Sequence, residues 1–264
     1  MTPGIYQGIT ADDYHGGPGY SKSQLDLVRQ APGLIQWARR SPYTHSDAAD
    51  IGHAVHCLLL EPAEFADRYV IEPVFNRRSN AGKDDAERFA RENRGRQIIS
   101  AEDDETIRNM HASVMAHPEA RALLAMPGES ESSVYWIDPA TGLLCRCRPD
   151  RWARPSRIMI DVKTTDDAAK FHWSVRDYRY DVQAAFYSDG AEAVGEPVDL
   201  FVFLVVGKRR EMGRYPVRVI ELQPSCIERG RLEYQQDLQA VAECERTGTW
   251  PGVELMNVPE RRVY

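Results

Sequence analysis

The stretch Ile158-Met159-Ile160-Asp161-Val162-Lys163 lies at the centre of residues 131–187, the segment around which the chain is organised. Its side chains alternate as those of a β-strand do, because successive residues in a strand point to opposite faces. We therefore predict a strand with one core face, formed by Ile158, Ile160 and Val162. The other face places an aspartate and a lysine side by side, because it carries Met159, Asp161 and Lys163.

A second strand is predicted immediately upstream, over residues 142–149, and it leads into Arg148-Pro149-Asp150. The connecting residues 151–156 contain a proline and several polar residues, so a hairpin is the natural connection. In a hairpin, Asp150 at the end of one strand comes close to Asp161 on the next. The pattern thus gathers two carboxylates and a lysine at the end of a small sheet.

Two carboxylates and a lysine suit a divalent metal and phosphodiester chemistry. Mg²⁺ prefers oxygen ligands, and a bound metal ion activates water and stabilises charge on a phosphate. A lysine beside the acid can orient or deprotonate the attacking water, or stabilise the pentavalent phosphate. The acid-x-Lys pattern alone is weak, because such short patterns arise by chance. Its weight comes from the apolar strand and from the upstream Asp150.

Four motifs occur in order along the chain: Gly52-His53-Ala54-Val55-His56, Arg148-Pro149-Asp150, Asp161-Val162-Lys163 and Gln183-Ala184-Ala185-Phe186-Tyr187. Together they resemble the PD-(D/E)xK nuclease superfamily, and within its RecB-like branch the RecE-type phage exonucleases (exodeoxyribonuclease VIII-like). The resemblance spans nearly the whole chain, including Tyr20-Ser21-Lys22-Ser23-Gln24-Leu25. It implies an α/β fold with a restriction-endonuclease-like core. That core is a central mixed β-sheet flanked by helices, with a helical N-terminal region.

The resemblance also implies roles for individual residues. Asp150 and Asp161 would hold Mg²⁺, for which Mn²⁺ could substitute, and Lys163 would assist the water or the transition state. Gln183 and Tyr187 are four residues apart on one helix face and would position the DNA strand. The remaining metal surroundings would come from His56, Glu131 and Val162.

Two of these residues have a plain structural alternative. A histidine at position 56 could be a hydrogen-bonded core residue, although the other motifs favour a role in the metal site, with His53 as a second candidate. Glu131 could be a solvated acid at a strand edge, and Glu129 competes with it for the same role.

Length and composition fit one globular domain of 264 residues, with no linker or low-complexity run to divide it. We divide it into a mainly helical part, a catalytic sheet and a C-terminal helix with its tail, at residues 1–126, 127–222 and 223–264. No apolar run is long enough for a membrane span, and the N-terminus lacks the pattern of a secretory signal. These features predict a cytoplasmic protein of a bacterial host cell, encoded by a phage or prophage by resemblance.

Five cysteines, an odd and small number, favour a reduced protein. Their spacing does not match the clustered thiols of iron–sulfur relatives, and Cys145-x-Cys147 has no second pair to complete a zinc site. We therefore expect neither an iron–sulfur cluster nor zinc.

The net charge of −7 argues mildly against a protein that coats DNA, but it permits a local basic groove. Its candidate residues are equally well explained as solvated charges, and they are Arg77, Arg78, Lys83, Arg146, Arg148, Arg151 and Arg154. Residues 76–83 form a basic segment that we predict to be a loop. A substrate-contacting loop and a plain connector are equally compatible with it.

The remaining periodicity predicts the other elements. Helices are expected over residues 21–40 with a break at Pro32, and over 47–60, 84–96, 102–126, 180–193 and 225–246. Strands are expected over residues 69–71, 198–206 and 215–222, of which 198–206 is apolar enough for a central strand covered on both faces. The tail, residues 250–264, has little periodicity.

The resemblance implies a metal-dependent exonuclease that degrades linear double-stranded DNA from an end, 5′ to 3′. The 3′ overhangs would pass to a single-strand annealing protein of the RecT type. A homo-oligomeric ring is likewise implied. Two alternatives remain: an endonuclease or RNA-acting nuclease of the same fold, and a non-catalytic nucleic-acid-binding accessory protein.

Overall fold

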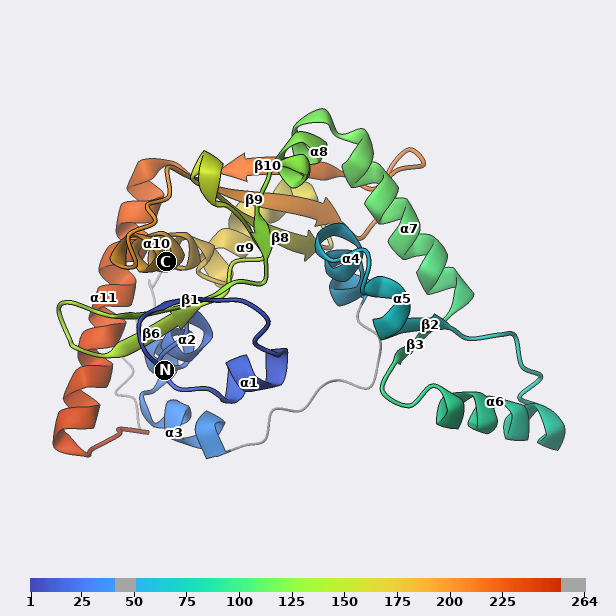
Figure 1. The fold of residues 1–264 in the computed structure, drawn as a ribbon, viewed down its shortest axis with the longest axis horizontal. Helices are drawn as coiled ribbons and strands as arrows, with labels where there is room; N and C mark the ends of the chain where they lie inside the picture. Colours follow the sequence, from blue (N-terminus) through green and yellow to red (C-terminus); the bar gives the residue numbers. More distant parts are fainter. Residues whose placement is uncertain (41–50, 253–264) are drawn as a thin grey trace, which may run out of the picture.

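A five-stranded mixed sheet forms the centre of the computed structural model, which describes residues 1–40 and 51–252 (Figure 1). The strand order is β10-β9-β8-β7-β4, in which β8 and β9 are parallel and the other neighbours are antiparallel. The strands are β4 (Glu129–Ser130), β7 (Arg151–Ala153), β8 (Ile158–Thr165), β9 (Leu200–Gly207) and β10 (Val217–Glu221). The prediction of a central mixed sheet is confirmed.

Strands β8 and β9 carry apolar side chains on both faces, because helices cover the sheet on both sides. On β8, Met159 belongs to one core, whereas Ile160 and Val162 belong to the other. The same alternation continues on β9, where Phe203 and Leu204 lie on opposite faces. The predicted core face of β8 is confirmed, and its opposite face is buried as well.

One face of the sheet is covered by helices from the first half of the chain, which share a core with it. They are α4 (Ile51–Leu60), α5 (Phe65–Arg68), α7 (Ala101–Ala116) and α8 (Pro118–Ala125). The other face packs against α2 (Lys22–Gln30), α9 (Phe171–Asp177), α10 (Tyr180–Ala193) and α11 (Pro224–Thr247). A parallel strand pair needs a long crossover, and α9 with α10 provides the one between β8 and β9.

A second, three-stranded sheet lies over α10 in the order β1-β5-β6. Its strands are β1 (Gly4–Tyr6), β5 (Ser133–Ile137) and β6 (Leu144–Cys147). The close approach of this sheet to α10 requires a glycine, because a Cβ at Gly190 would lie 2.6 Å from the ring of Trp136. The helix that carries Gln183 and Tyr187 is therefore held between two sheets.

The predicted hairpin exists, but its first strand was wrong. Asp161 lies in β8, and the strand that pairs with it is β7, with Arg151 opposite Ile160. Residues 144–147 instead form β6 in the second sheet. Pro149 has no N–H for a ladder, and the chain crosses between the sheets at Pro149-Asp150. Asp150 nevertheless ends up beside β8, because β7 begins at the next residue.

Several helix boundaries differ from the predictions at capping residues. The break at Pro32 is confirmed, because α2 is followed by α3 (Gly33–Arg40). Residues 102–126 form two helices, since the chain turns at His117 and α8 starts with Pro118. The helix predicted at residue 84 starts earlier, as α6 (Asn80–Glu92), because Ser79 caps it. The second half of the predicted loop 76–83 is therefore helical.

The remaining predicted elements are present. Helices α10 and α11, strand β10 and the short strand β2 (Tyr69–Ile71) lie where the periodicity placed them. The predicted start of the second helix at residues 47–50 lies outside the described residues, as does the tail from residue 253. No helix in the described part of the chain is long and apolar enough to cross a membrane.

An arm projects from the main body and is made of residues 69–99 (Figure 1). It contains β2 and β3 (Gln97–Ile99), which form a parallel pair, and helix α6 between them. The short helix α1 (Ala11–Gly16) follows β1 and lies in the main body, away from the arm (Figure 1).

Candidate metal centre and active site

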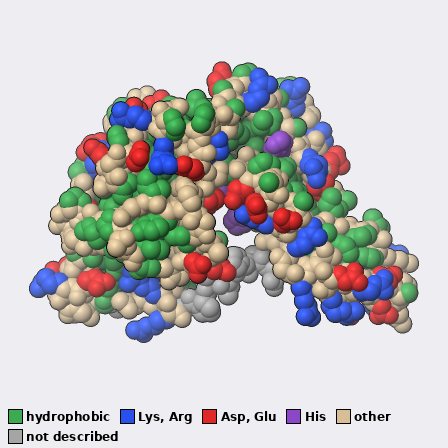
Figure 2. Space-filling view, in the orientation of Figure 1, with side chains coloured by type: hydrophobic (Ala, Val, Ile, Leu, Met, Phe, Trp, Pro, Cys, Tyr) green, Lys and Arg blue, Asp and Glu red, His purple; other side chains and the backbone are tan. Residues whose placement is uncertain are grey.

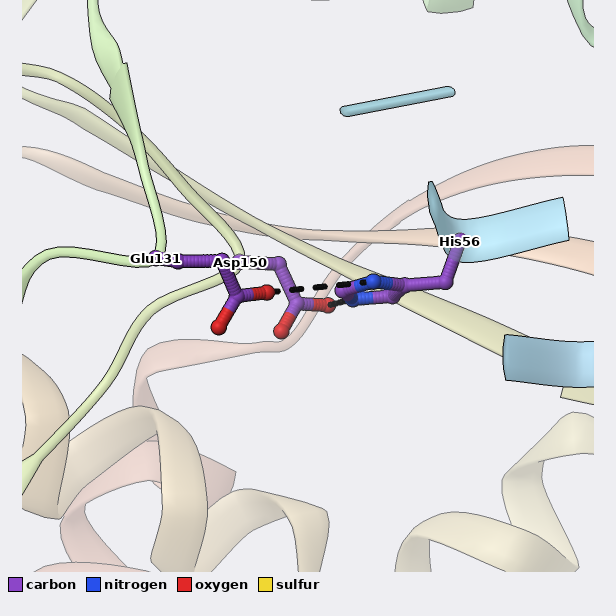
Figure 3. A group of neighbouring side chains, drawn as sticks. All are labelled: His56, Glu131 and Asp150. Carbon is purple, nitrogen blue, oxygen red and sulfur yellow. Dashed lines mark ion pairs between the residues drawn. The ribbon is translucent and has the colours of Figure 1, made fainter. Parts of the chain in front are cut away.

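Three side chains from separate elements converge beside the β7–β8 hairpin (Figure 3). His56 comes from α4, Asp150 immediately precedes β7, and Glu131 lies between β4 and β5. His56 Nε2 is 2.9 Å from Asp150 Oδ2, and His56 Nδ1 is 3.8 Å from Glu131 Oε1. One ligand atom from each residue lies within 4.8 Å of the others. This spacing allows all three to contact one metal ion.

The backbone fixes the two acids. Asp150 Oδ2 accepts the N–H of Val162 at 2.6 Å, which joins the carboxylate to strand β8. The N–H of Glu131 donates to the carbonyl of Asp150 at 3.1 Å. Glu131 has a φ of 56°, a left-handed conformation that is uncommon outside glycine and clusters at functional sites. The departure from β4 thus turns Glu131 toward Asp150 instead of extending the strand.

Asp161 and Lys163 lie next to this group on β8. Asp161 is almost fully buried, and its Oδ2 accepts a hydrogen bond from Gln183 Nε2 at 2.5 Å. Its Oδ1 forms an ion pair with the ammonium of Lys163. Both carboxylate oxygens therefore have a partner, and a cation bound at Oδ1 would share that oxygen with Lys163. Gln183 orients the carboxylate from the opposite side.

Burial and close packing of like charges shift the acid–base behaviour of the cluster. Burial and the neighbouring Asp150 raise the pKa of Glu131 to about 7 and that of Asp161 to about 6. Burial alone would lower the pKa of His56, but Asp150 and Glu131 outweigh it and raise this pKa to about 9. Such perturbations are typical of functional sites.

Asp150 and Lys163 keep their charges. Burial opposes ionisation of Asp150, yet His56 and Lys163 lower its pKa. Burial likewise opposes the ammonium of Lys163, but Asp161 and Asp150 raise its pKa. The site therefore contains at least one permanent carboxylate and a permanent ammonium around neutral pH.

The donors fit a divalent cation. Carboxylate oxygens suit Mg²⁺ and Mn²⁺, and an imidazole is tolerated better by Mn²⁺ than by Mg²⁺. Without a cation, the raised pKa values favour the protonated forms of Glu131 and Asp161 and the positively charged form of His56. A bound cation could replace the positive charge of His56. Val162 contributes its N–H to Asp150, while its side chain packs in the core. The role of Val162 in metal binding stays a prediction, and it concerns the backbone carbonyl because the side chain is apolar and the N–H donates to Asp150.

A cavity of about 460 Å³ opens onto the cluster. In Figure 2 the surface is hollowed near the middle of the view, and acidic and histidine side chains gather at the inner end of the hollow. The predicted site residues that line the cavity are His53, His56, Glu131, Asp150, Val162, Lys163 and Tyr187. A larger cavity, of about 1260 Å³, contains none of these residues. Chemistry therefore identifies the smaller one as the site.

Tyr187 also reaches the cavity, as its position one helical turn after Gln183 predicts. Burial raises the pKa of its hydroxyl, so the phenol remains a hydrogen-bond donor. Gln183 differs from its predicted role, since in this structure its amide donates to Asp161 and not toward the cavity. It acts on the site by holding that carboxylate.

The basic residues do not form one groove. The prediction that Arg146 belongs to a basic groove was wrong, because its side chain is buried and donates to the carbonyls of His15 and Gly17. Arg151 donates to the carbonyl of Met126, and Arg154 pairs with Glu129. That pairing also removes Glu129 as a competitor of Glu131, since it lies at the sheet edge.

Three other basic residues remain available for a ligand. Arg148 lines the cavity, although it also donates to Ser133 and to the carbonyl of Ile9. On the arm, Arg78 and Lys83 are exposed and form no ion pair with described residues, whereas Arg77 pairs with Glu72.

Sequence reasoning missed two walls of the cavity. Tyr180 lines it and lies three residues before Gln183 and seven before Tyr187, so helical spacing could have found it. The residues Ala11, Tyr14 and His15 line it from α1. No pattern in the sequence links that segment to the site, because the contact depends on how β1 adds to the second sheet.

The fold and this cluster of an acid pair, a lysine and a histidine define a PDDEXK-like nuclease domain. Residues 29–257 match the family described as "PDDEXK-like domain of unknown function (DUF3799)", and the chain belongs to this family. The PD-(D/E)xK superfamily predicted from the four motifs is confirmed, together with its fold class.

The structure is also similar to a crystal structure described as that of a putative exonuclease from Eubacterium rectale. The TM-score is 0.60 at 12% sequence identity, and the match covers 98% of this chain and 95% of the other. At this identity, the likeness shows a shared fold. No curated protein sequence matches the chain.

Proposed function

We propose that the protein is a metal-dependent exodeoxyribonuclease of the RecE type, acting on linear double-stranded DNA. The observation that carries the proposal is the joint presence of His56, Glu131 and Asp150 around one point, with Asp161 and Lys163 beside them. A non-catalytic binding protein has no need of a buried acid pair next to a charged lysine, because that arrangement costs folding free energy.

The proposed metal ligands are His56, Glu131, Asp150 and Asp161, with Mg²⁺ as the ion and Mn²⁺ as a substitute. A divalent ion there would supply Lewis-acid chemistry, polarising the scissile phosphate and easing the deprotonation of water. The chain itself aims the carboxylates: Val162 holds Asp150, and Gln183 holds Asp161. Such fixed donors need little reorganisation when charge develops.

Lys163 would stabilise the negative charge that develops on the phosphate. Its ammonium is held against Asp161 and borders the cavity, so it can contact a phosphate oxygen placed there. Tyr187 would donate its hydroxyl to a second phosphate oxygen, because its phenol stays protonated and faces the same cavity. Arg148 adds a fixed positive charge at the cavity wall.

The resemblance to RecE-type exonucleases extends the proposal to the direction of degradation, the DNA product and the protein partners. We propose 5′ to 3′ degradation that leaves 3′ single-stranded overhangs for an annealing protein of the RecT type. A ring of identical subunits around the DNA would retain the substrate. The site cavity is open to the surface and could admit a strand (Figure 2).

The deciding experiment is digestion of linear duplex DNA labelled at either the 5′ or the 3′ end, with Mg²⁺, Mn²⁺ or EDTA. Asp161→Asn serves as the site variant, and Asp199→Asn, which alters an exposed acid paired with Arg157, serves as the control. We expect metal-dependent release of the 5′ label by the wild type and the control only. Intact linear, nicked and single-stranded DNA under all conditions would refute a nuclease.

Covalently closed circular DNA tests the requirement for an end. An exonuclease leaves it intact and degrades the same molecule after linearisation. Cleavage of the closed circle at a comparable rate would instead establish an endonuclease of the same fold.

A further inference from the structure

Three aromatic rings form a series from the core to the surface beside Lys163. Phe171 is buried, with 1% of its surface exposed, and stacks on Tyr180 with ring centroids 5.6 Å apart and planes at 23°. Tyr180 in turn stacks on Tyr178, at 5.7 Å and 27°. Tyr180 lines the site cavity, whereas Tyr178 is 62% exposed. The series therefore ends in a ring that still has surface available for another planar group.

The backbone between the two tyrosines is strained and firmly held. Arg179 has φ 52° and ψ 49°, the left-handed conformation that a side chain rarely adopts. Its guanidinium is largely buried and pairs with Asp26 at 3.2 Å, Glu233 at 3.2 Å and Asp237 at 2.6 Å. Strain of this kind persists only where the surroundings impose it, and it clusters at ligand sites. The two rings are thus preorganised.

Two lysines flank the ring of Tyr180. Lys163 Nζ lies 4.7 Å from the centroid of the Tyr180 ring, and Lys22 Nζ lies 5.9 Å from it. Lys22 also donates to the carbonyl of Tyr178 at 2.5 Å and pairs with Asp26 at 2.7 Å. Aromatic faces next to cations are the combination that proteins use for single-stranded nucleic acid, because bases stack on rings while cations contact phosphates.

Packing within the protein does not explain Tyr178. A ring that is 62% exposed contributes little buried area to the fold, yet its backbone is fixed by a network of four charged side chains, of which Asp237 is buried and Arg179 largely so. A base inside a duplex is already stacked and paired, so it is not free to cover this ring. The ligand that fits is an unpaired nucleotide.

We propose that Tyr178 and Tyr180 form a stacking subsite for an unpaired base of the strand that enters the active site, with its phosphate near Lys163. The subsite rests on the proposed nuclease function and adds a requirement to it: the end of the duplex must open before the strand is cleaved. Substrates with an unpaired end are therefore bound more tightly than blunt ones.

The test uses a duplex whose 5′ end carries a short unpaired extension with 2-aminopurine, a base whose fluorescence falls on stacking. Binding is measured with Ca²⁺ in place of Mg²⁺ to suppress cleavage. Tyr178→Phe keeps the ring and Tyr178→Leu removes it. We expect the wild type and the Phe variant to quench the fluorescence, and the Leu variant to lose the quench and bind about tenfold more weakly. Tenfold corresponds to about 1.4 kcal/mol, within the range for stacking of one base.

An abasic nucleotide at the same position separates stacking from a general structural effect. On that substrate the wild type and Tyr178→Leu should bind equally, because no base is present to stack. Equal quenching and equal Kd for both proteins on the 2-aminopurine substrate would overturn the subsite. If the wild type also cleaves DNA in Mg²⁺, that result leaves the nuclease function standing. A Tyr178-dependent quench without cleavage under any condition would instead overturn the function and retain the subsite.

Discussion

His56 Nε2 lies 2.9 Å from Asp150 Oδ2, a contact that joins helix α4 to the hairpin that carries Asp161 and Lys163. The two residues are 94 positions apart in the sequence, and Asp150 immediately precedes β7 of the central sheet. A cation bound at the proposed metal site would replace the positive charge of the protonated His56, so the proposal couples metal binding to protonation.

Replacing His56 by alanine should weaken metal binding and activity together. Loss of a nitrogen ligand leaves only the carboxylates, and we expect Mn²⁺ affinity to fall by at least about tenfold. Titration calorimetry with Mn²⁺ measures the affinity. As a control, His111→Ala changes a histidine on α7, outside the cavity. Equal Mn²⁺ affinities for wild type and His56→Ala would remove His56 from the metal site.

The metal-free protein should lose stability as the pH rises from 6 to 9. His56 has its pKa raised to about 9, from an ordinary 6.5, and Glu131 has its pKa raised to about 7. A group with a raised folded pKa binds more protons in the folded state, so its stabilisation is complete below the unfolded pKa and is lost as pH rises. The pKa of Asp150 is lowered, so the stabilisation from this carboxylate is lost only as the pH falls into the acidic range, below the window from 6 to 9.

Thermal unfolding in EDTA at pH 6 and pH 9 measures this loss, which should amount to about 1–3 kcal/mol. Addition of Mn²⁺ at pH 9 should restore the stability, because the cation replaces the lost proton. His56→Gln controls for other groups that titrate in this range, and its stability should depend less on pH. A wild-type protein that is more stable at pH 9 than at pH 6 in EDTA would contradict the prediction.

The sequence predicted strand β8, which carries Asp161 and Lys163, the neighbouring strand β9 and the helix that carries Gln183 and Tyr187, because each has a clear local pattern. The hairpin partner of β8 was mispredicted, since residues 144–147 and 151–153 each combine apolar residues with one arginine and only the sheet to which each is added distinguishes them. The approach of Tyr14 to the site likewise depends on pairing between β1 and β5, whose paired residues are 127 to 131 positions apart and leave no local pattern.

Lys163→Met should reduce the rate of cleavage far more than the binding of metal or DNA. The methionine fills a similar volume without the ammonium, so the developing charge on the phosphate loses a donor. Removal of one such donor costs about 10²–10³ in kcat. Single-turnover digestion measures the rate, and Mn²⁺ calorimetry measures the metal site. A variant that cleaves at the wild-type rate would show that Lys163 has no part in the chemistry.

Arg179→Ala should destabilise the fold through the carboxylates it leaves behind. The Arg179 side chain is 13% exposed and pairs with Asp26, Glu233 and Asp237. Removing one partner of a buried ion pair costs about 3–5 kcal/mol. Here the cost comes chiefly from the buried Asp237, because Asp26 and Glu233 are partly exposed and Asp26 keeps its pair with Lys22. Urea denaturation at pH 7 measures the change in the free energy of unfolding.

The matched control for Arg179 is Arg88→Ala, which removes an exposed arginine paired with Asp85 on α6. An exposed ion pair contributes little, since water and salt screen it, and the midpoint of unfolding should not move measurably. The two variants remove the same side chain, so their difference isolates burial of the partners. Arg179→Lys should recover only part of the loss, because an ammonium cannot reach three carboxylates as a planar guanidinium does. Equal midpoints for the two alanine variants would show that the network around Arg179 does not hold the turn between Tyr178 and Tyr180.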